Sequence, residues 1–376
     1  MSGRSLEKTK ILFIVPDLYS GGAQRVFMNL VRSFSRVRFD ITLVTLIKPN
    51  DEYFARLLPK DIRIVQYNFL HTRQAFFPLI GLIRKEQPHV VFSTLTHLNF
   101  ILAIVKKFVS SNIKFVARES NTISSSLKDE KFPWLFRFFY ERAYKTFDLI
   151  ICQSKAMAAD LVTNFKIPLS RLKIIYNPLD VDLIMANITK GNPQQAERSR
   201  IELISVGRLN PQKGFDRLLK IMTLLHDFDF RLRILGDGVL KESLIKQAHA
   251  LGLDSKVHFL GIQENPFRYM AESDCLLLTS YYEGLPNVVL EANACGLSVI
   301  AFDSPGGTSE IIENGLNGWL IKDGDLHGFA EKIRARPYLH VNKQSIVKYV
   351  VDRFSIDNIT TQYEDAILSL NKAMDD

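Results

Sequence analysis

Glu283 and Glu291 are separated by seven residues, with a Gly-Leu-Pro turn after the first, and this pair could bind a ligand that carries many hydroxyl groups. Proline suits the first position of a helix because its missing N–H would be unpaired there. A helix starting near Pro286 would carry Glu291 in its second turn and leave Glu283 on the preceding loop. The backbone amides at this helix start belong to Leu285, Asn287 and Val288.

Backbone amides at a helix N-terminus bind anions. Carboxylates beside an anion site favour a ligand that has both phosphates and hydroxyls, so the segment Glu283–Glu291 indicates a nucleotide-sugar site. The alternative is an exposed acidic helix start, because Asp and Glu are common in the first turn of helices.

A second segment that could take part in binding or catalysis is Gly207–Gly214, in which Arg208 and Lys213 flank a proline turn. Arginine can donate two hydrogen bonds to one phosphate and lysine supplies a point charge. The two cations could therefore hold a diphosphate without a metal ion, and we expect neither a metal nor a cofactor. The alternative is a loop with two exposed basic residues.

Two glycine turns supply further candidate positions. Gly21 and Gly22 precede a predicted helix, where glycine lets a phosphate approach the backbone closely. Gly261 follows a predicted strand, where backbone groups could meet a planar base. The turn at Gly21 is not a full dinucleotide fingerprint, which argues against NAD or FAD. A plain tight turn between strand and helix explains it equally well.

These loops follow short apolar segments that alternate with amphipathic segments of helix length. The first series of predicted strands is Ile11–Val15, Ile41–Thr45, Ile62–Tyr67, Val90–Ser93, Lys114–Ala117 and Leu149–Gln153. The second is Ile201–Val206, Phe230–Leu235, Val257–Leu260, Cys275–Thr279, Ser298–Ala301 and Gly318–Ile321. The alternation predicts an α/β fold of two doubly wound, Rossmann-like domains, with ligands at the carboxyl ends of the strands.

The 376 residues allow two domains of about 150 residues each. A predicted strand, Lys173–Tyr176, runs into Pro178, which cannot continue a ladder of hydrogen bonds. We therefore expect a first domain over residues 1–176 and a second over 177–355. The polar stretch 187–200 predicts a surface loop, and residues 356–376 predict a C-terminal helix.

Composition points to a globular protein in a reducing compartment. The chain is 47% hydrophobic and 23% charged, and its three cysteines have no spacing typical of a disulfide framework or a metal site. No apolar run reaches the roughly 18 residues of a membrane-spanning helix. Residues 1–180 contain 27 Lys and Arg against 14 Asp and Glu, a net charge of +13, whereas the remainder is at −5. The basic half favours an anionic partner.

Taken together, these segments resemble the retaining GT-B glycosyltransferases of the glycosyltransferase family 4 group, above all those that extend lipid-linked or cell-surface glycans in bacteria. The likeness covers nearly the whole chain. Its motifs are Ser20–Arg25, Gly207-Arg208 with Lys213-Gly214, Gly236–Gly238, the Glu283–Glu291 pair and Gly315–Gly318. The resemblance implies two domains that face each other across a cleft, with the C-terminal helix returning to the first.

The resemblance also implies roles for single residues. Glu291 would hold the ribose and Glu283 the donor-sugar hydroxyls, while Arg208 and Lys213 would stabilise the leaving diphosphate. The remaining donor-binding positions implied are Gly21, Gly22, Gly207, Gly261, Leu285, Asn287 and Val288. In this family the acceptor is thought to attack from the face that the diphosphate leaves, without a protein nucleophile.

One departure concerns the first domain. Many relatives carry a histidine near the donor sugar, where this chain has Arg118 and Glu119. Either Glu119 takes over the contact with the sugar, or Arg118 binds a phosphate of the acceptor. His97, in the loop after the strand Val90–Ser93, is a further candidate, although a lone histidine is more often structural.

The acceptor side is less defined. The segment 131–145 is aromatic and basic, as in helices that lie in a membrane interface, although aromatic residues at helical spacing are usually core. Segments 76–80 and 106–108 are similar. We expect a nucleotide sugar, most simply a UDP sugar, as donor and a polyprenyl-diphosphate-linked glycan as acceptor. The protein would act as a peripheral enzyme on the cytoplasmic face of an anionic membrane, in polysaccharide biosynthesis.

Three alternatives differ in kind. A sugar-nucleotide epimerase on a similar fold would need no acceptor groove, and a phosphorylase would need a lysine-bound pyridoxal phosphate, which no feature here demands. A nucleic-acid-binding protein would account for the high pI, but its cations should cluster with exposed aromatic residues. Arg208 and Lys213 lie instead in the acidic half, so we expect no nucleic acid as partner.

Overall fold

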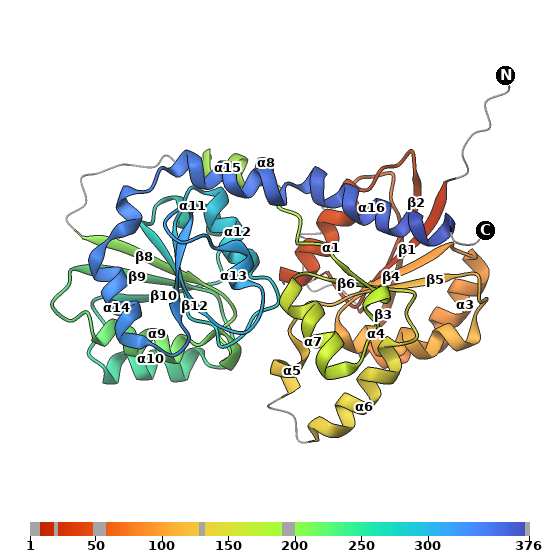
Figure 1. Ribbon diagram of the computed structural model, residues 1–376, viewed down its shortest axis with the longest axis horizontal. Coiled ribbons are helices and arrows are strands. Elements are labelled where there is room, and N and C mark those ends of the chain that lie inside the picture. Colours follow the sequence, from red (N-terminus) through yellow and green to blue (C-terminus); the bar gives the residue numbers. More distant parts are fainter. Residues whose placement is uncertain (1–7, 19–21, 48–57, 128–131, 190–199, 373–376) are drawn as a thin grey trace. The chain divides into compact units, whose positions relative to one another are not determined.

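The computed structural model describes residues 8–18, 22–47, 58–127, 132–189 and 200–372. The chain forms two compact units: unit 1 comprises residues 1–178 and 356–376, and unit 2 comprises residues 179–355. The division falls after Pro178, two residues beyond the expected boundary at residue 176. Figure 1 shows the helices and strands of each unit.

Unit 1 is built on a parallel sheet. Within the described residues its strands are β1 (Thr9–Val15), β2 (Phe39–Ile47), β3 (Arg63–Phe69), β4 (Val90–Thr94), β5 (Lys114–Arg118), β6 (Leu149–Cys152) and β7 (Leu172–Ile174). Their order in the sheet is β3-β2-β1-β4-β5-β6-β7. The order reverses between β1 and β4, and such a switch point is where doubly wound sheets bind ligands.

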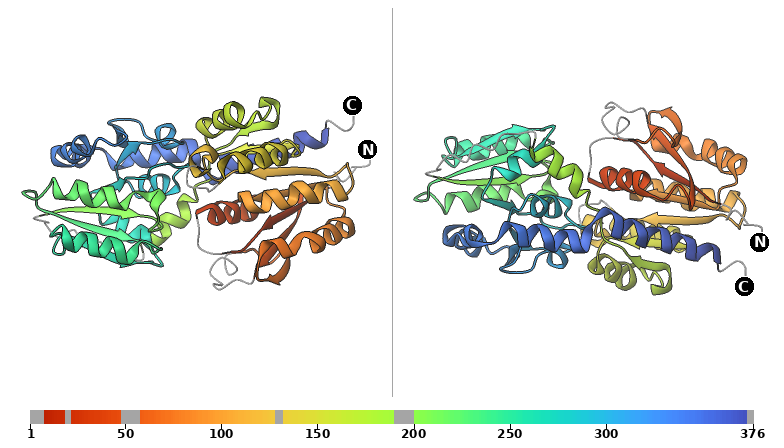
Figure 2. Two further views of the ribbon diagram at one scale, coloured as in Figure 1. Left: turned by 90° about the horizontal axis from the view of Figure 1, so that it is seen from below. Right: turned by 90° about the horizontal axis from the view of Figure 1, so that it is seen from above.

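Helices cover both faces of this sheet. They are α1 (Gly22–Ser33), α3 (Phe76–Glu86), α4 (Thr96–Val105), α5 (Ile123–Ser126), α6 (Pro133–Tyr144), α7 (Lys155–Phe165) and α16 (Ile356–Lys372). One core lies under α1 and α16, and the other lies under α3, α4, α6 and α7. Figures 1 and 2 show α16, in blue, and α6, in yellow, on opposite faces.

The expected return of the C-terminal helix to the first domain is confirmed. In α16, Ile359, Tyr363 and Ile367 recur at helical spacing and are fully buried in the core that they share with α1. Glu364, on the same helix, accepts hydrogen bonds from the Ser35 amide at 2.6 Å and from Arg38 Nη1 at 2.8 Å. Apolar burial and a charged pair therefore hold the helix on unit 1.

Unit 2 repeats the plan. Its described strands are β8 (Ile201–Val206), β9 (Phe230–Leu235), β10 (Val257–Gly261), β11 (Cys275–Leu278), β12 (Val299–Asp303) and β13 (Gly318–Lys322). Its helices are α8 (Val181–Thr189), α9 (Phe215–Thr223), α10 (Lys241–Ala250), α11 (Pro266–Ala271), α12 (Asn287–Ala294), α13 (Thr308–Ile311), α14 (Leu326–Ala335) and α15 (Lys343–Phe354). The strand order β10-β9-β8-β11-β12-β13 reverses between β8 and β11.

Two parallel sheets with helices on them confirm the predicted α/β fold, and each predicted strand overlaps an observed one. One prediction was wrong in part: α8 continues through residues 187–189, which were expected in a loop, and residues 190–199 lie outside the described part. In that described part, every helix is too short or too polar to cross a bilayer.

Candidate nucleotide-sugar site

The switch point of unit 2 brings together loops that are far apart in the sequence. Arg208 and Lys213 follow β8, and Glu283 follows β11, the neighbouring strand. Lys213 Nζ lies 2.6 Å from Glu283 Oε1 and donates a hydrogen bond to it. Two of the predicted site residues, 70 positions apart, therefore meet at the place where this fold binds ligands.

The carboxylate of Glu283 is the buried member of this pair. Its side chain is 6% exposed and that of Lys213 is 21% exposed. Ser280 Oγ donates a second hydrogen bond to the same Oε1 at 2.6 Å. Arg208, in contrast, is exposed, and among the described residues no acidic side chain lies within ion-pair distance of its guanidinium.

Gly214 explains why Lys213 reaches Glu283. Its φ is +62°, and a Cβ there would lie 2.1 Å from the carbonyl oxygen of Thr279, at the end of β11. Only glycine permits both the left-handed conformation and this close approach. The loop after β8 can therefore lie directly against the loop after β11.

Arg217, which no sequence motif singled out, braces the loop that carries Glu283. It is buried in α9, its Nε donates to the carbonyl of Thr279 at 2.5 Å, and its Nη2 donates to the carbonyl of Ser280. Its Nη1 contacts Asp323 at 2.7 Å. The guanidinium thus fixes the loop that presents Glu283. A charged residue among the apolar positions of α9 was the available signal, but a sequence gives no partner for it.

Gly306 brings a third loop to Glu283. Its φ is +127°, and a Cβ there would lie 1.9 Å from the Glu283 carbonyl oxygen. The Glu283 amide donates to Pro305 O at 3.0 Å, and the Gly307 amide donates to Gly284 O at 2.8 Å. The loop after β12 therefore holds both sides of the Glu283 peptide.

Helix α12 begins one residue later than expected. Pro286 is its N-cap residue rather than its first helical residue, and α12 starts at Asn287. Glu291 is half-buried in the second turn, as predicted. Leu285 is buried just before the helix, whereas Asn287 and Val288 are half-buried in its first turn. The segment therefore has the predicted form of a loop carboxylate followed by a helix carboxylate.

Buried asparagines brace this helix. Asn317 Nδ2 donates to Asn293 Oδ1 at 2.8 Å, and Asn293 Nδ2 donates back to the Asn317 carbonyl at 3.1 Å. Both side chains have no exposed surface. Asn293 lies on α12, so the Gly315–Gly318 motif acts on the site by holding the helix that carries Glu291.

The remaining donor-side glycines are at strand ends. The Gly207 amide donates to Leu235 O at 3.0 Å, and the Gly236 amide donates to Gly261 O at 2.8 Å. Val239 and Ile262, next to these turns, are highly exposed for apolar residues. Backbone hydrogen bonds thus join the carboxyl ends of β8, β9 and β10, and exposed apolar side chains lie beside them.

At the switch point of unit 1, Gly22 begins α1 after β1, and Gly21 lies outside the described residues. Gln24 donates to Asp17 Oδ1 at 3.2 Å. His97, on the first turn of α4 after β4, is exposed at the same edge. Partial removal from water lowers the pKa of His97, and the nearby carboxylate of Asp17 opposes this, so the imidazole is neutral at pH 7.

Glu119 is fully buried, one residue past β5. Its Oε2 accepts the hydroxyls of Tyr140 and Tyr144, the latter at 2.5 Å, and its Oε1 accepts the hydroxyl of Thr96 at 3.3 Å. The Ser120 amide also donates to Oε1, at 2.8 Å. The carboxylate therefore has its partners inside unit 1, and a direct contact with a sugar would require the tyrosines to move.

Arg118 has protein partners in place of the expected acceptor phosphate. Its guanidinium is fully buried. It donates to Asn177 Oδ1 at 2.6 Å, to Tyr363 Oη at 3.2 Å and to Thr94 Oγ1 at 3.3 Å. The structure thus gives Arg118 a positioning role: it ties β5 and β4 to α16 and to the end of unit 1, and it is not available at the surface.

The chain has two Rossmann-like units. Unit 2 carries paired charges at its switch point, and the C-terminal helix α16 packs on unit 1. These features define a GT-B glycosyltransferase. Residues 20–183 match the model of Glycosyltransferase Family 4, and residues 189–336 match that of Glycosyl transferases group 1. The chain belongs to these families and is a glycosyltransferase, as predicted.

The chain is also similar to a named enzyme in sequence and to solved structures in fold. The chain is 28% identical, over 83% of its length and 86% of the relative's, to N-acetylgalactosamine-N,N'-diacetylbacillosaminyl-diphospho-undecaprenol 4-alpha-N-acetylgalactosaminyltransferase of Campylobacter jejuni. Its fold matches Anabaena Alr3699/HepE in complex with UDP-glucose, with a TM-score of 0.80, 21% identity and coverage of 96% and 99%. Sucrose-phosphate synthase of Thermosynechococcus elongatus gives a TM-score of 0.79 at 16% identity, with coverage of 97% and 100%.

Proposed function

We propose that the protein transfers a sugar from a UDP sugar to a polyprenyl-diphosphate-linked glycan with retention of anomeric configuration. The observation that carries this proposal is the ion pair between Lys213 and Glu283 at the switch point of unit 2, with Arg208 exposed on the same loop. Lys213 can bind a phosphate, and Glu283 can bind hydroxyl groups of a sugar. Their contact therefore suits the junction between the diphosphate and the sugar of the donor.

Charge development gives these residues their roles. Cleavage of the bond between sugar and phosphate leaves negative charge on the diphosphate and makes the sugar cation-like. Arg208 and Lys213 stabilise that charge more in the transition state than in the ground state, which lowers the barrier. We propose that the two cations suffice for this and that the reaction needs no metal ion. Full activity in EDTA would support this part, and loss of activity that is restored by Mg²⁺ would refute it.

Glu283 binds the donor sugar and does not attack it. Lys213 and Ser280 both donate to its Oε1, and two such hydrogen bonds lower the nucleophilicity of a carboxylate. Glu291, on α12, accepts the ribose hydroxyls. In unit 1, His97 is exposed and Glu119 is buried, so we propose His97 rather than Glu119 as the residue of this edge that is available to a substrate. The acceptor then attacks on the face that the diphosphate leaves, and the leaving phosphate takes the proton.

Donor and acceptor classes are inferred from relatives. The Anabaena structure contains UDP-glucose, and the name of the Campylobacter enzyme gives a diphospho-undecaprenol-linked acceptor. Such an acceptor is membrane-borne, so we place this enzyme at the inner face of the cytoplasmic membrane. The net charge of +13 on residues 1–180 supports attachment to anionic lipid, at about 1 kcal/mol per basic residue close to the surface.

A panel of nucleotide sugars, screened for an increase in melting temperature, tests the donor assignment because a ligand that binds only the folded state raises its stability. We expect a UDP sugar to give the largest increase. Transfer of that sugar to a synthetic polyprenyl-diphosphate glycan, followed by NMR of the product anomer, tests the acceptor and the stereochemistry. An inverted anomer would refute retention, and isomerised donor without acceptor would indicate an epimerase.

A further inference from the structure

The first half of α6 is a projecting apolar helix. Every residue from Phe132 to Phe139 is exposed, on all sides of the helix, and most are aromatic or aliphatic. The exposed fraction reaches 69% for Trp134 and 54% for Phe139. A helix that is apolar all round is normally covered by protein or lipid. The alternative raised by the sequence, that these rings are core, holds only for Tyr140 and Tyr144.

A second exposed apolar group lies in the same helical layer. Phe77 on α3 is 78% exposed, and Ile104 on α4 and Phe108 just after it are about half exposed. Phe76 contacts the rings of both Phe77 and Phe108 and links them into one cluster. Because α3, α4 and α6 share one core, the two apolar groups lie on the same face of the sheet of unit 1.

Basic side chains stand among these rings. Arg142 is exposed and its guanidinium lies 3.7 Å from the centroid of the Phe138 ring. Arg137 and Lys107 are also exposed, within α6 and beside Phe108 respectively. Exposed aromatic residues interleaved with Arg and Lys are typical of surfaces that enter the headgroup region of an anionic bilayer. A contact between two protein chains would not require this excess of positive charge.

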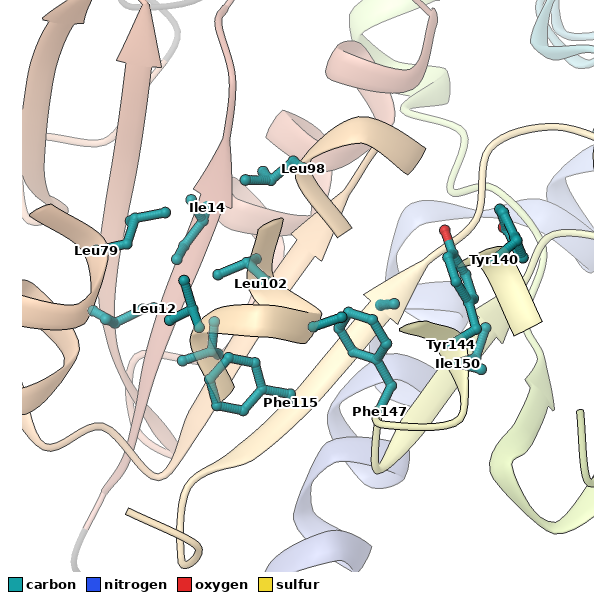
Figure 3. Close-up of a cluster of buried hydrophobic side chains, with 14 of the residues drawn as sticks. Leu12, Ile14, Leu79, Leu98, Leu102, Phe115, Tyr140, Tyr144, Phe147 and Ile150 are labelled. Atoms are coloured by element: carbon teal, nitrogen blue, oxygen red, sulfur yellow. The ribbon is translucent and has the colours of Figure 1, made fainter. Parts of the chain in front are cut away.

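The base of α6 is tied to the carboxyl edge of the sheet. Tyr140 and Tyr144 lie side by side in Figure 3. Their rings stack with centroids 3.9 Å apart, and both hydroxyls donate to Glu119. Burial raises the pKa of both tyrosines, so they remain protonated donors. Glu119 in turn accepts the Thr96 hydroxyl, next to His97. A displacement of α6 would therefore reach the residues at the switch point of unit 1.

We propose that α6 and the cluster at Phe77 and Phe108 dock on an anionic bilayer, and that the two tyrosines transmit the position of the docked helix to Glu119. This inference deepens the proposed function, because it places a membrane-borne acceptor next to the edge that carries His97. The first half of α6 would bind lipid, and Tyr140 and Tyr144 in its second half bind the buried carboxylate of Glu119.

Vesicle flotation of the full chain tests docking without any substrate, using phosphatidylcholine vesicles with and without phosphatidylglycerol. We expect the protein to float only with phosphatidylglycerol. The double substitution Trp134→Ser with Phe139→Ser should weaken binding about tenfold or more, because burying a large apolar side chain is worth more than one decade in affinity. Val37→Ser, 81% exposed in the turn between α1 and β2, is the matched control and should change nothing.

Fluorescence gives an independent readout, since Trp134 and Trp319 are the two tryptophans of the chain. With Trp319→Phe, emission from Trp134 should shift to the blue on addition of phosphatidylglycerol vesicles and be quenched by brominated lipid. Equal flotation of the double variant and the wild type, or no shift from Trp134, would overturn docking. A dimer in gel filtration that the double variant converts to monomer would assign the surface to a second copy instead.

Hydrogen exchange tests transmission through the tyrosines. The Ser120 amide donates to Glu119, so its exchange should slow when vesicles bind the wild type. Tyr140→Phe with Tyr144→Phe should leave flotation unchanged and abolish this slowing. Slowing that persists in the variant would refute transmission while leaving docking intact. Neither readout needs a donor or acceptor, so failure of the transferase assignment would remain distinguishable from failure of this proposal.

Discussion

Both sheets reverse their strand order beside their first strand, between β1 and β4 in unit 1 and between β8 and β11 in unit 2. At the edge of unit 2, Lys213 and Glu283 are in contact, and their loops are braced by Gly214 and Arg217. At the edge of unit 1, the charged residue Glu119 is instead turned inward to two tyrosines.

The difference shows two ways of using the same architecture. Unit 2 already holds the charge pair that we propose for ligand binding at its edge, and such preorganisation would reduce the reorganisation needed for catalysis. In unit 1, the charged residues Arg118 and Glu119 are buried in the interior. His97 and the apolar first half of α6 are exposed. We therefore expect substitutions at the edge of unit 2 to affect chemistry and those at the edge of unit 1 to affect positioning.

The largest effect is expected when the cation of the pair is removed. Lys213→Met should lower kcat/KM by about 10²–10³-fold, the effect of losing one preorganised group that stabilises transition-state charge. Transfer of the sugar selected by the thermal panel is the measurement. Lys220→Met, an exposed lysine of α9, should behave as wild type. Equal rates for the Lys213 variant and this control would contradict the role of the ion pair.

The close approach of the two loops can be tested by stability. Gly214→Ala and Gly252→Ala both put a side chain at a left-handed φ, which costs about 1–2 kcal/mol. A Cβ at Gly252 meets nothing within 4 Å, whereas one at Gly214 meets the Thr279 carbonyl at 2.1 Å. Urea unfolding should therefore show a larger loss for Gly214→Ala. If the two losses are equal, the contact between the loops is not needed for stability.

The affinity for UDP alone tests the role of Glu291, on α12, independently of Glu283, on the preceding loop. Glu291→Ala should raise the Kd for UDP about 10–100-fold, because hydrogen bonds to a charged group contribute about 1.5–3 kcal/mol. Calorimetry with UDP alone measures this without the sugar. Glu242→Ala, exposed in the first turn of α10, is the control. An unchanged affinity for UDP would show that Glu291 does not bind the ribose.

The sequence predicted the strands and the residues that follow them, because buried parallel strands are apolar and the loops after them are not. It could not predict that Lys213 and Glu283 touch, since the contact depends on which strands are neighbours in the sheet. It also misjudged Arg118, because a charged residue gives no sign of the partners that allow its burial. Those partners, such as Asn177 and Tyr363, lie far along the chain.

The smallest effect is expected at His97, which we expect to position a substrate rather than to take part in the reaction. His97→Gln should lower kcat/KM about two- to tenfold, the loss of one hydrogen bond between neutral groups. Because removal from water lowers its pKa, the wild-type imidazole should stay neutral as the pH falls to about 6.5, the usual histidine value, and become protonated only below it. The wild-type kcat/KM should thus hold through that range and then fall, whereas the glutamine variant should lack this fall. Superimposable pH profiles would show that His97 does not contact a substrate, and the edge of unit 1 would then act only through its buried residues.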